Sequence, residues 1–272
     1  MNFSMLWWQF LLLIVGSYLY GSVNNAILIT RLMGKDIRKI GSGNPGTMNV
    51  SRNFGIKIGA LVLVLDMLKG VVPTLIAVLV FTDKTFEYST LPVSVMAKYM
   101  AGFFVVLGHI FPAYYKLKGG KGIATTIGIF LVCDFFVGAI FGIVALCFIL
   151  VTRIGSMGSF LATTPPAIFA CIDLYNKYYL VEPVLEYRIT YLVFANMFIL
   201  GIIALTWVAH RQNIQRLLSG DEHPTEWLQM IKDIKLKKQK AQQEDQLDDV
   251  TEAVDNVKSD DQIVESQDLI TE

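Results

Sequence analysis

Residues 56–81 read IKIGALVLVLDMLKGVVPTLIAVLVF, and this long apolar run decides the fold class. A helix needs about 20 mostly apolar residues to cross the hydrocarbon core of a bilayer, and the run is long enough. Four further stretches of the same kind lie at about 5–30, 93–111, 156–172 and 188–209. We therefore expect an all-α membrane protein that crosses the bilayer several times.

One more apolar stretch, 123–151, contains Asp134 near its middle. A lone carboxylate inside a membrane-spanning helix is costly, which favours a break in the helix at this residue. We predict a short span at 122–133 and a full span at 135–152. This division gives seven transmembrane helices, one of them short.

The composition excludes several classes of protein. Of the 272 residues 54% are hydrophobic and 17% are charged, and the mean hydropathy is +0.51. These values exclude a disordered protein, a nucleic-acid-binding module and a disulfide scaffold. The chain should lie in a lipid bilayer and should bind no nucleic acid.

A net charge of zero conceals two different parts of the chain. Residues 1–220 contain 17 Lys or Arg and 8 Asp or Glu, whereas residues 221–272 contain 6 and 15. We predict a membrane domain at 1–222 and an acidic, largely disordered tail at 223–272. Within the tail, residues 224–240 fit either a short amphipathic helix on the membrane surface or a plain solvated helix.

The positive-inside rule orients the helices. Segments 31–57 and 112–121 are rich in Lys and Arg, whereas the first 30 residues contain neither. With seven spans Arg153, Arg211 and Arg216 also fall on the side of these basic segments, but with six spans the last two would not. We therefore expect the N-terminus outside and the C-terminus in the cytoplasm.

The first basic segment carries a glycine-rich turn, GSGNPGTMNVSR at residues 41–52. Glycine N–H groups and a helix start can together hold an anion, and Arg52 adds a guanidinium suited to phosphate. An ordinary Gly/Pro turn between two spans explains the turn alone equally well. The candidates for substrate contact in this segment are Ser42, Gly43, Asn44, Gly46, Asn49 and Arg52.

The second basic segment reads GHIFP at 108–112 and KGGKG at 118–122. Bare glycine N–H groups and one ammonium group would thereby meet at the start of an apolar helix. The spacing does not match a Walker A motif, so nucleotide hydrolysis is not supported. Lys116 and Lys118 are explained by membrane topology, since they hold the loop inside and contact anionic headgroups. A functional role is favoured for Lys121. For His109 a functional role and a buried structural role both stay open. The candidates in this segment are His109, Gly119, Gly120, Lys121 and Gly122.

The third basic segment reads HRQNIQRLLSG at 210–220 and predicts a short helix that ends at Gly220. Residues 210 and 213 share one face of that helix. A basic stop-transfer end at the membrane surface explains Arg211, but it explains His210 and Asn213 poorly. These two residues are therefore the candidates in this segment.

A separate pair, Asp66 and Lys69, lies within the span at 56–81. An ion pair inside a membrane is a candidate functional site by default, and a purely structural pair explains it equally well. The three histidines form no HExxH motif, and no other pairing of metal ligands is visible. We expect neither a metal site nor a cofactor.

Taken together and in this order, the three segments resemble the PlsY family of bacterial membrane glycerol-3-phosphate acyltransferases. The resemblance runs from about residue 16 to 222 and includes DIR at 36–38 and LDMLKG at 65–70. The chain departs from the family pattern at Thr47, where Ala is usual, at residues 23–25, and in the acidic tail. It also lacks the His-x-x-x-x-Asp motif of other lipid acyltransferases.

The resemblance implies a reaction. The sn-1 hydroxyl of glycerol 3-phosphate attacks the carbonyl carbon of an acyl phosphate, giving lysophosphatidic acid and phosphate. Because acyl phosphate is an activated mixed anhydride, the protein mainly has to position two phosphates and offset their charge. The implied protein is a multi-pass enzyme of the bacterial plasma membrane with a cytoplasmic site. It would have a functional link to the enzyme that forms acyl phosphate.

We assign roles to the candidates as a hypothesis. Ser42, Arg52 and Lys121 hold glycerol 3-phosphate, and the amides around Gly43–Gly46, with Asn44 and Asn49, receive the donor head or the developing oxyanion. The glycines at 119, 120 and 122 let the second loop close over the site. His210 and Asn213 orient the hydroxyl or complete the pocket.

Two other classes of protein share some of these features. An organic-anion transporter would also carry basic, glycine-rich cytoplasmic segments, but it should contain inverted repeats, and none is visible. A membrane-anchored protein that works through its acidic tail is the second alternative. It leaves the three glycine-rich and basic segments unexplained.

Overall fold

The computed structural model describes residues 3–86, 91–180, 186–221 and 236. Within these residues six stretches are long and apolar enough to cross a membrane, and one shorter apolar helix accompanies them. The prediction of an all-α membrane protein with seven spans, one of them short, is confirmed. The helices concerned are α1 (Phe3–Ser22) with α2 (Asn25–Leu32), α4 (Ile56–Phe81), α5 (Val93–Ile110), the short α6 (Ile123–Cys133), α7 (Phe135–Thr152), α8 (Gly155–Leu174) and α9 (Glu186–Ala209).

The helices break where polar side chains can cap them. The stretch predicted as one span at 5–30 is divided into α1 and α2, because Asn24 Oδ1 accepts a hydrogen bond from the Ile27 amide at 3.0 Å. The predicted break at Asp134 is also present. Its carboxylate accepts a hydrogen bond from the Val137 amide at 3.1 Å and so begins α7. This capping role satisfies a carboxylate that would be costly within a continuous helix.

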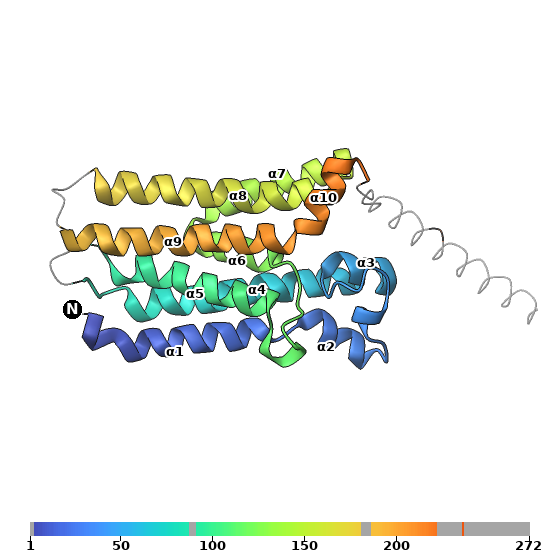
Figure 1. Ribbon diagram of the computed structural model, residues 1–272, viewed down its shortest axis with the longest axis horizontal. Coiled ribbons are helices and arrows are strands. Elements are labelled where there is room, and N and C mark those ends of the chain that lie inside the picture. The colour runs from blue at the N-terminus through green and yellow to red at the C-terminus, as the bar shows by residue number, and fades with distance from the viewer. Residues whose placement is uncertain (1–2, 87–90, 181–185, 222–235, 237–272) are drawn as a thin grey trace, which may run out of the picture. The chain divides into compact units, whose positions relative to one another are not determined.

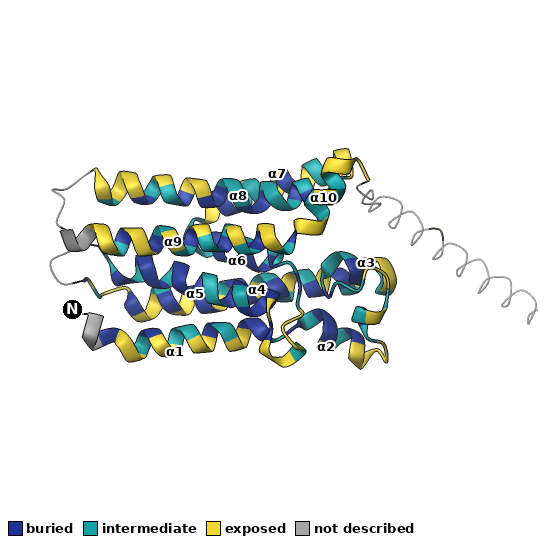
Figure 2. Ribbon diagram, viewed as in Figure 1, coloured by how far each residue is buried: buried dark blue, intermediate teal, exposed yellow. Residues whose placement is uncertain are grey.

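Helix α5 lies among α1, α4 and α9 and is the most buried of the spanning helices (Figures 1 and 2). Glycines bring its neighbours close. A Cβ on Gly21 of α1 would overlap the Val105 carbonyl of α5, and a Cβ on Gly108 of α5 would overlap the Tyr18 carbonyl of α1. Small residues at such contacts allow dense helix packing inside a membrane.

The short elements gather at one end of the helix bundle (Figure 1). They are α2, α3 (Thr47–Phe54) and α10 (Arg211–Ser219), together with the 3-10 turns at Ile37–Lys39 and Ala113–Tyr115. A π-helical turn, Tyr175–Tyr179, extends α8 at its C-terminal end. The three basic, glycine-rich segments therefore share one end of the protein.

The chain divides into two units, Met1–Thr225 and Glu226–Glu272, and all the helices above belong to the first. The predicted acidic tail at 223–272, with its helix at 224–240, lies outside the described residues except for Leu236.

Candidate active site

The glycine-rich turn of the first segment is folded around the side chain of Asn49, which is 4% exposed. Its Oδ1 accepts a hydrogen bond from the Ser42 amide at 3.1 Å, and its Nδ2 donates to the carbonyls of Ile37 and Ile40 at 3.3 and 2.9 Å. Gly43 has a φ of 69°, which favours glycine. The Asn49 amide thus holds the loop in shape through hydrogen bonds to its backbone.

The outer side of this loop is polar and accessible. Ser42 and Arg52 are exposed, and Asn44 is partly exposed. Gly46 is the N-cap of α3 and has no side chain that could cap it, so the positive end of the α3 dipole favours an anion there. The loop therefore offers a hydroxyl, an amide, a helix start and a guanidinium on one short segment.

An ion pair anchors the chain just before the loop. Arg38 Nη2 lies 2.6 Å from Asp36 Oδ2, and the guanidinium lies 5.8 Å from the centre of the Tyr115 ring. The hydrogen bonds from Arg38 hold the pKa of the Asp36 carboxyl well below its usual range. This contact links the first segment to the chain that follows α5.

The second segment turns back onto the end of α5. The Gly119 amide donates to the Ile110 carbonyl and the Gly120 amide to the His109 carbonyl, each at 3.1 Å. Carbonyls at a helix C-terminus lack helical partners, so these bonds satisfy them. The expectation that these two glycines offer bare amides is therefore wrong. They shape the loop that carries Lys121.

His109 supports the same loop from inside the bundle. Its ring is buried, and its Nδ1 lies 3.3 Å from Thr125 Oγ1. A Cβ on Gly120 would overlap Nε2 of the ring, so this position requires glycine. Gly122, with a φ of 80°, then begins α6. The His109 ring therefore lies against Gly120, next to Lys121 in the chain.

Lys121 joins the second segment to the third, because its Nζ donates a hydrogen bond to Asn213 Oδ1. His210 lies between α9 and α10 and is 2% exposed. Burial and the positive charge of Lys121 lower the pKa of His210 to about 4, so the imidazole is neutral at pH 7. Its Nδ1 lies 2.8 Å from the Thr206 carbonyl, which can only accept. Nδ1 therefore carries the hydrogen, and Nε2 has a lone pair.

A comparison with known protein families identifies the family of this chain. The family model described as Glycerol-3-phosphate acyltransferase matches residues 11–220. The chain belongs to the glycerol-3-phosphate acyltransferase family. This confirms the resemblance to PlsY and the enzyme class, an acyltransferase.

Curated glycerol-3-phosphate acyltransferases resemble the chain over most of their length. The protein of Mycoplasmopsis pulmonis is 33% identical over 214 residues, covering 78% of this chain and 92% of the relative. The protein of Aquifex aeolicus is 36% identical over 215 residues, covering 78% and 97%. The crystal structure of PlsY (YgiH), an integral membrane glycerol 3-phosphate acyltransferase, in its glycerol 3-phosphate form is 34% identical, has a TM-score of 0.65 and covers 82% and 98%. Its lysophosphatidic acid form has a TM-score of 0.64.

Among the predicted site residues of this acyltransferase, the structure brings Lys121 and Asn213 into direct contact, and His210 lies near enough for the charge of Lys121 to lower its pKa. Ser42 and Arg52 lie at the same end of the bundle, on the first loop and on α3 (Figure 1). Within the described residues, no group of three or more His, Cys, Asp or Glu is placed to hold a metal ion.

Three polar residues outside the predicted set contact the predicted residues or their loops, two through a side chain and one through its backbone carbonyl. Asn24 Nδ2 donates to the Pro45 carbonyl in the glycine-rich turn at 3.3 Å. Thr125 contacts the His109 ring, and the carbonyl of Thr206 fixes the His210 ring. Asn24 carries a sequence signal, because it is a polar residue inside an apolar span. The two threonines carry none.

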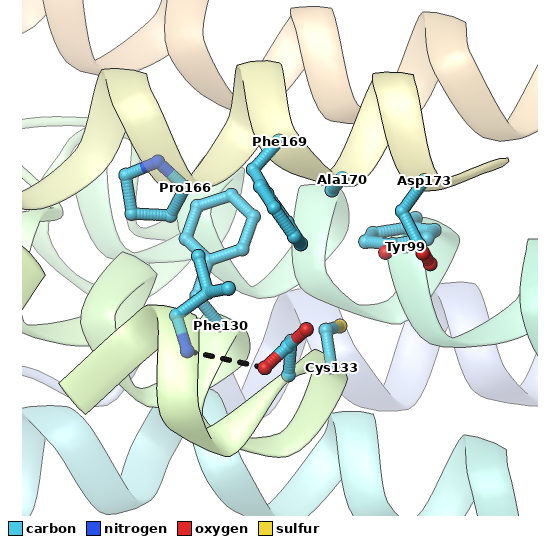
Figure 3. A pocket seen from close by; sticks show the side chains of 9 residues that line it. Tyr99, Phe130, Cys133, Pro166, Phe169, Ala170 and Asp173 are labelled. Atoms are coloured by element: carbon cyan, nitrogen blue, oxygen red, sulfur yellow. Dashed lines mark hydrogen bonds between the residues drawn. The ribbon is translucent and has the colours of Figure 1, made fainter. Parts of the chain in front are cut away.

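A small pocket lies elsewhere in the acyltransferase, between α5, the junction of α6 and α7, and α8 (Figure 3). Tyr99 and Asp173 lie together at one side of it, and Pro166 and Phe169 at the other. Its lining contains none of the predicted site residues. Tyr99 is ten residues from His109 on the same helix, which corresponds to about 15 Å. The pocket is therefore separate from the candidate active site.

Proposed function

We propose that the protein transfers an acyl chain from acyl phosphate to the sn-1 hydroxyl of glycerol 3-phosphate, forming lysophosphatidic acid and inorganic phosphate. The hydroxyl oxygen attacks the acyl carbonyl carbon, the bond from that carbon to the phosphate oxygen breaks, and the phosphate leaves. The proton of the hydroxyl passes to phosphate. The related PlsY structures, solved in a glycerol 3-phosphate form and a lysophosphatidic acid form, support the acceptor and the product.

The observation that carries the proposal is the contact of Lys121 with Asn213 beside His210. The ammonium group of Lys121 is held at the end of the bundle that carries the glycine-rich loop, and its charge acts on the neutral imidazole of His210. In our assignment Lys121 binds the phosphate of glycerol 3-phosphate, assisted by Arg52 and Ser42. Asn213 holds the ammonium group in position.

The neutral His210 ring suits a particular role. Nε2 can accept a hydrogen bond from the sn-1 hydroxyl and direct its oxygen toward the donor. Neutral His210 is a weak base for full proton removal at pH 7, because its conjugate acid has a pKa of about 4. The second pKa of a phosphate is about 6, which makes phosphate the better proton acceptor. We therefore assign orientation to His210 and proton acceptance to substrate phosphate.

The donor head is assigned to the glycine-rich loop. The start of α3 at Gly46, with Asn44 beside it, favours the phosphate or the oxyanion that develops on the attacked carbonyl. Asn49 keeps this loop closed through its three hydrogen bonds. The acyl chain would remain in the lipid phase between spans, so the reaction needs no carrier protein or coenzyme A.

We further propose that the site faces the cytoplasm of a bacterial cell, with the N-terminus outside. The concentration of Lys and Arg at the end of the bundle that carries the three segments supports this orientation. An acyl-phosphate-forming enzyme would supply the donor on the same side of the membrane.

The test is an assay of purified protein in detergent with glycerol 3-phosphate and either palmitoyl phosphate or palmitoyl-CoA. We expect lysophosphatidic acid acylated at sn-1, with phosphate release that requires glycerol 3-phosphate, from palmitoyl phosphate alone. Turnover of the CoA thioester instead would keep the acyltransferase and refute the donor. No product from either donor in well-folded protein would refute the proposed reaction and favour an organic-anion transporter.

A further inference from the structure

The proposed reaction leaves one buried ion pair without a role. Asp66 and Lys69 lie on α4 in the membrane-spanning part of the chain, 3% and 2% exposed, with Lys69 Nζ 3.2 Å from Asp66 Oδ1. Burying ionisable groups within a membrane span costs free energy, so such groups usually have a specific structural or functional role. Their other hydrogen bonds identify that role.

Both side chains form hydrogen bonds with residues at the break between α1 and α2. Lys69 Nζ donates to the Val23 carbonyl, and Asn25 Nδ2 donates to Asp66 Oδ1 at 2.9 Å. Helix α1 ends at Ser22 and α2 begins at Asn25, and the Val23 carbonyl between them accepts its hydrogen bond from Lys69. In a membrane such backbone groups must be satisfied by protein. The ion pair therefore fixes the geometry of the break.

The break is tied in turn to the glycine-rich loop. Asn24, between the two residues that contact the ion pair, is 2% exposed. Its Oδ1 caps α2, and its Nδ2 donates to the carbonyl of Pro45 at 3.3 Å. Pro45 lies between Asn44 and Gly46, which we assign to the donor head. A shift of the break would therefore move this loop.

The same turn of α4 also contacts the second loop. Gly70 follows Lys69, and a Cβ on Gly70 would overlap the Thr125 carbonyl of α6. The hydroxyl of Thr125 contacts the His109 ring, which lies against Gly120. One turn of α4 thus reaches the glycine-rich loop through Asn24 and the Lys121 loop through Thr125.

We propose that Asp66 and Lys69 are positioning residues of the active site. The ion pair fixes the break between α1 and α2, and through Asn24 it sets the glycine-rich loop relative to the loop that carries Lys121. The kinetic part of this inference rests on the proposed function. The structural part does not, and it can be measured separately.

The test compares the double variant Asp66→Asn/Lys69→Met with wild type. Both charges are removed together because a single substitution leaves an unpaired buried charge, which is strongly destabilising by itself. Met at position 69 cannot donate to the Val23 carbonyl, whereas Asn at position 66 still accepts from Asn25. The control is Thr74→Val, which removes a buried hydroxyl five residues beyond Lys69 on α4. This hydroxyl donates to the Gly70 carbonyl of its own helix.

The first readout is hydrogen exchange of the backbone amides of residues 41–44 and 46, which needs no catalysis. We expect exchange about tenfold faster in the double variant, the change that the loss of one hydrogen bond produces, and wild-type exchange in Thr74→Val. Unchanged exchange of the loop in a folded double variant would overturn the proposal.

The second readout is the kinetics of acyl transfer by the same proteins. A positioning role predicts a KM for glycerol 3-phosphate raised about tenfold together with a lower kcat. A purely structural role predicts less folded protein with an unchanged KM, and that result would also overturn the proposal. If the wild type does not turn over, the proposed reaction fails, while the exchange measurement still decides the positioning role.

A second variant covers the case in which the double variant does not fold. Asn24→Ser keeps a side-chain acceptor for the start of α2 but is too short to donate to the Pro45 carbonyl. We expect faster exchange of the same backbone amides and a raised KM here as well. Wild-type values for both would contradict the link from the break to the loop.

Discussion

The contact between Lys121 and Asn213 predicts a large effect of a small substitution, Asn213→Asp. The side chains have nearly the same shape, so the hydrogen bond to Lys121 Nζ remains available. The substitution places a negative charge against the ammonium group that we assign to the phosphate of glycerol 3-phosphate. It should weaken substrate binding with little change in packing.

The magnitude follows from the geometry. A phosphate oxygen bonded to the same Nζ lies about 5.5 Å from the new carboxylate, the sum of two hydrogen-bond lengths. Two unit charges at that distance repel by about 3 kcal/mol at an effective dielectric constant of about 20. This corresponds to a fall in kcat/KM for glycerol 3-phosphate of about 100-fold. The added carboxylate should also raise the pKa of the neighbouring His210.

The assay is the steady-state formation of lysophosphatidic acid at pH 7.5, with palmitoyl phosphate saturating and glycerol 3-phosphate varied. The matched control is Gln212→Glu, which adds the same charge to α10 at an exposed position. We expect kcat/KM of the control to stay within about twofold of wild type, since exposed charges are well screened. A fall of less than threefold in Asn213→Asp would refute the placement of the substrate phosphate at Lys121.

Four further predictions follow from the same contacts. Lys121→Met should abolish turnover at saturating substrates while membrane insertion, followed by fractionation, is unchanged. Because the pKa of His210 is about 4 when folded and 6.5 ordinarily, the unfolded chain takes up a proton first as the pH falls. His210 should therefore contribute a fall of up to about 3 kcal/mol in the free energy of unfolding between pH 6.5 and 4, and His210→Asn should reduce the pH dependence of denaturation curves by that contribution. Gly120→Ala should lower Tm and activity, since its Cβ would overlap a histidine ring, whereas Gly16→Ala, whose Cβ would meet no atom within 4 Å, should change neither. Deletion of residues 225–272 should leave kcat near wild type, because every assigned site residue precedes the deletion; a large loss would favour a working role for the tail.

The spans could be predicted from the sequence because a helix that crosses a bilayer needs about 20 mostly apolar residues, and few other structural elements contain such a long apolar run. The break at Asp134 could be predicted because a carboxylate within a span is costly. The break at Asn24 could not be located from the apolar pattern, which continues across it. It depends on the contacts of Asn24, Asn25 and Lys69 with segments far away in the chain.

The residue types of the candidate site could be predicted from the sequence, but the role of each residue could not. Glycine-rich turns with Lys and Arg indicate phosphate binding, and they gather at one end of the bundle. The sequence could not separate groups that face a substrate from groups that hold the loops. The Asn49 side chain and the amides of Gly119 and Gly120 form hydrogen bonds with nearby backbone. These bonds depend on where α3 begins and α5 ends, which the sequence does not show.

In the proposed reaction the sn-1 hydroxyl attacks the carbonyl carbon of acyl phosphate, and oxygen labelling distinguishes this attack from attack at phosphorus. Glycerol 3-phosphate labelled with oxygen-18 at the sn-1 hydroxyl is incubated with palmitoyl phosphate and the purified enzyme. The account predicts that all the label appears in the single-bonded ester oxygen of lysophosphatidic acid and that released phosphate stays unlabelled, with one phosphate formed per ester. Label in a phosphate ester, or phosphate release with no labelled ester, would contradict the account.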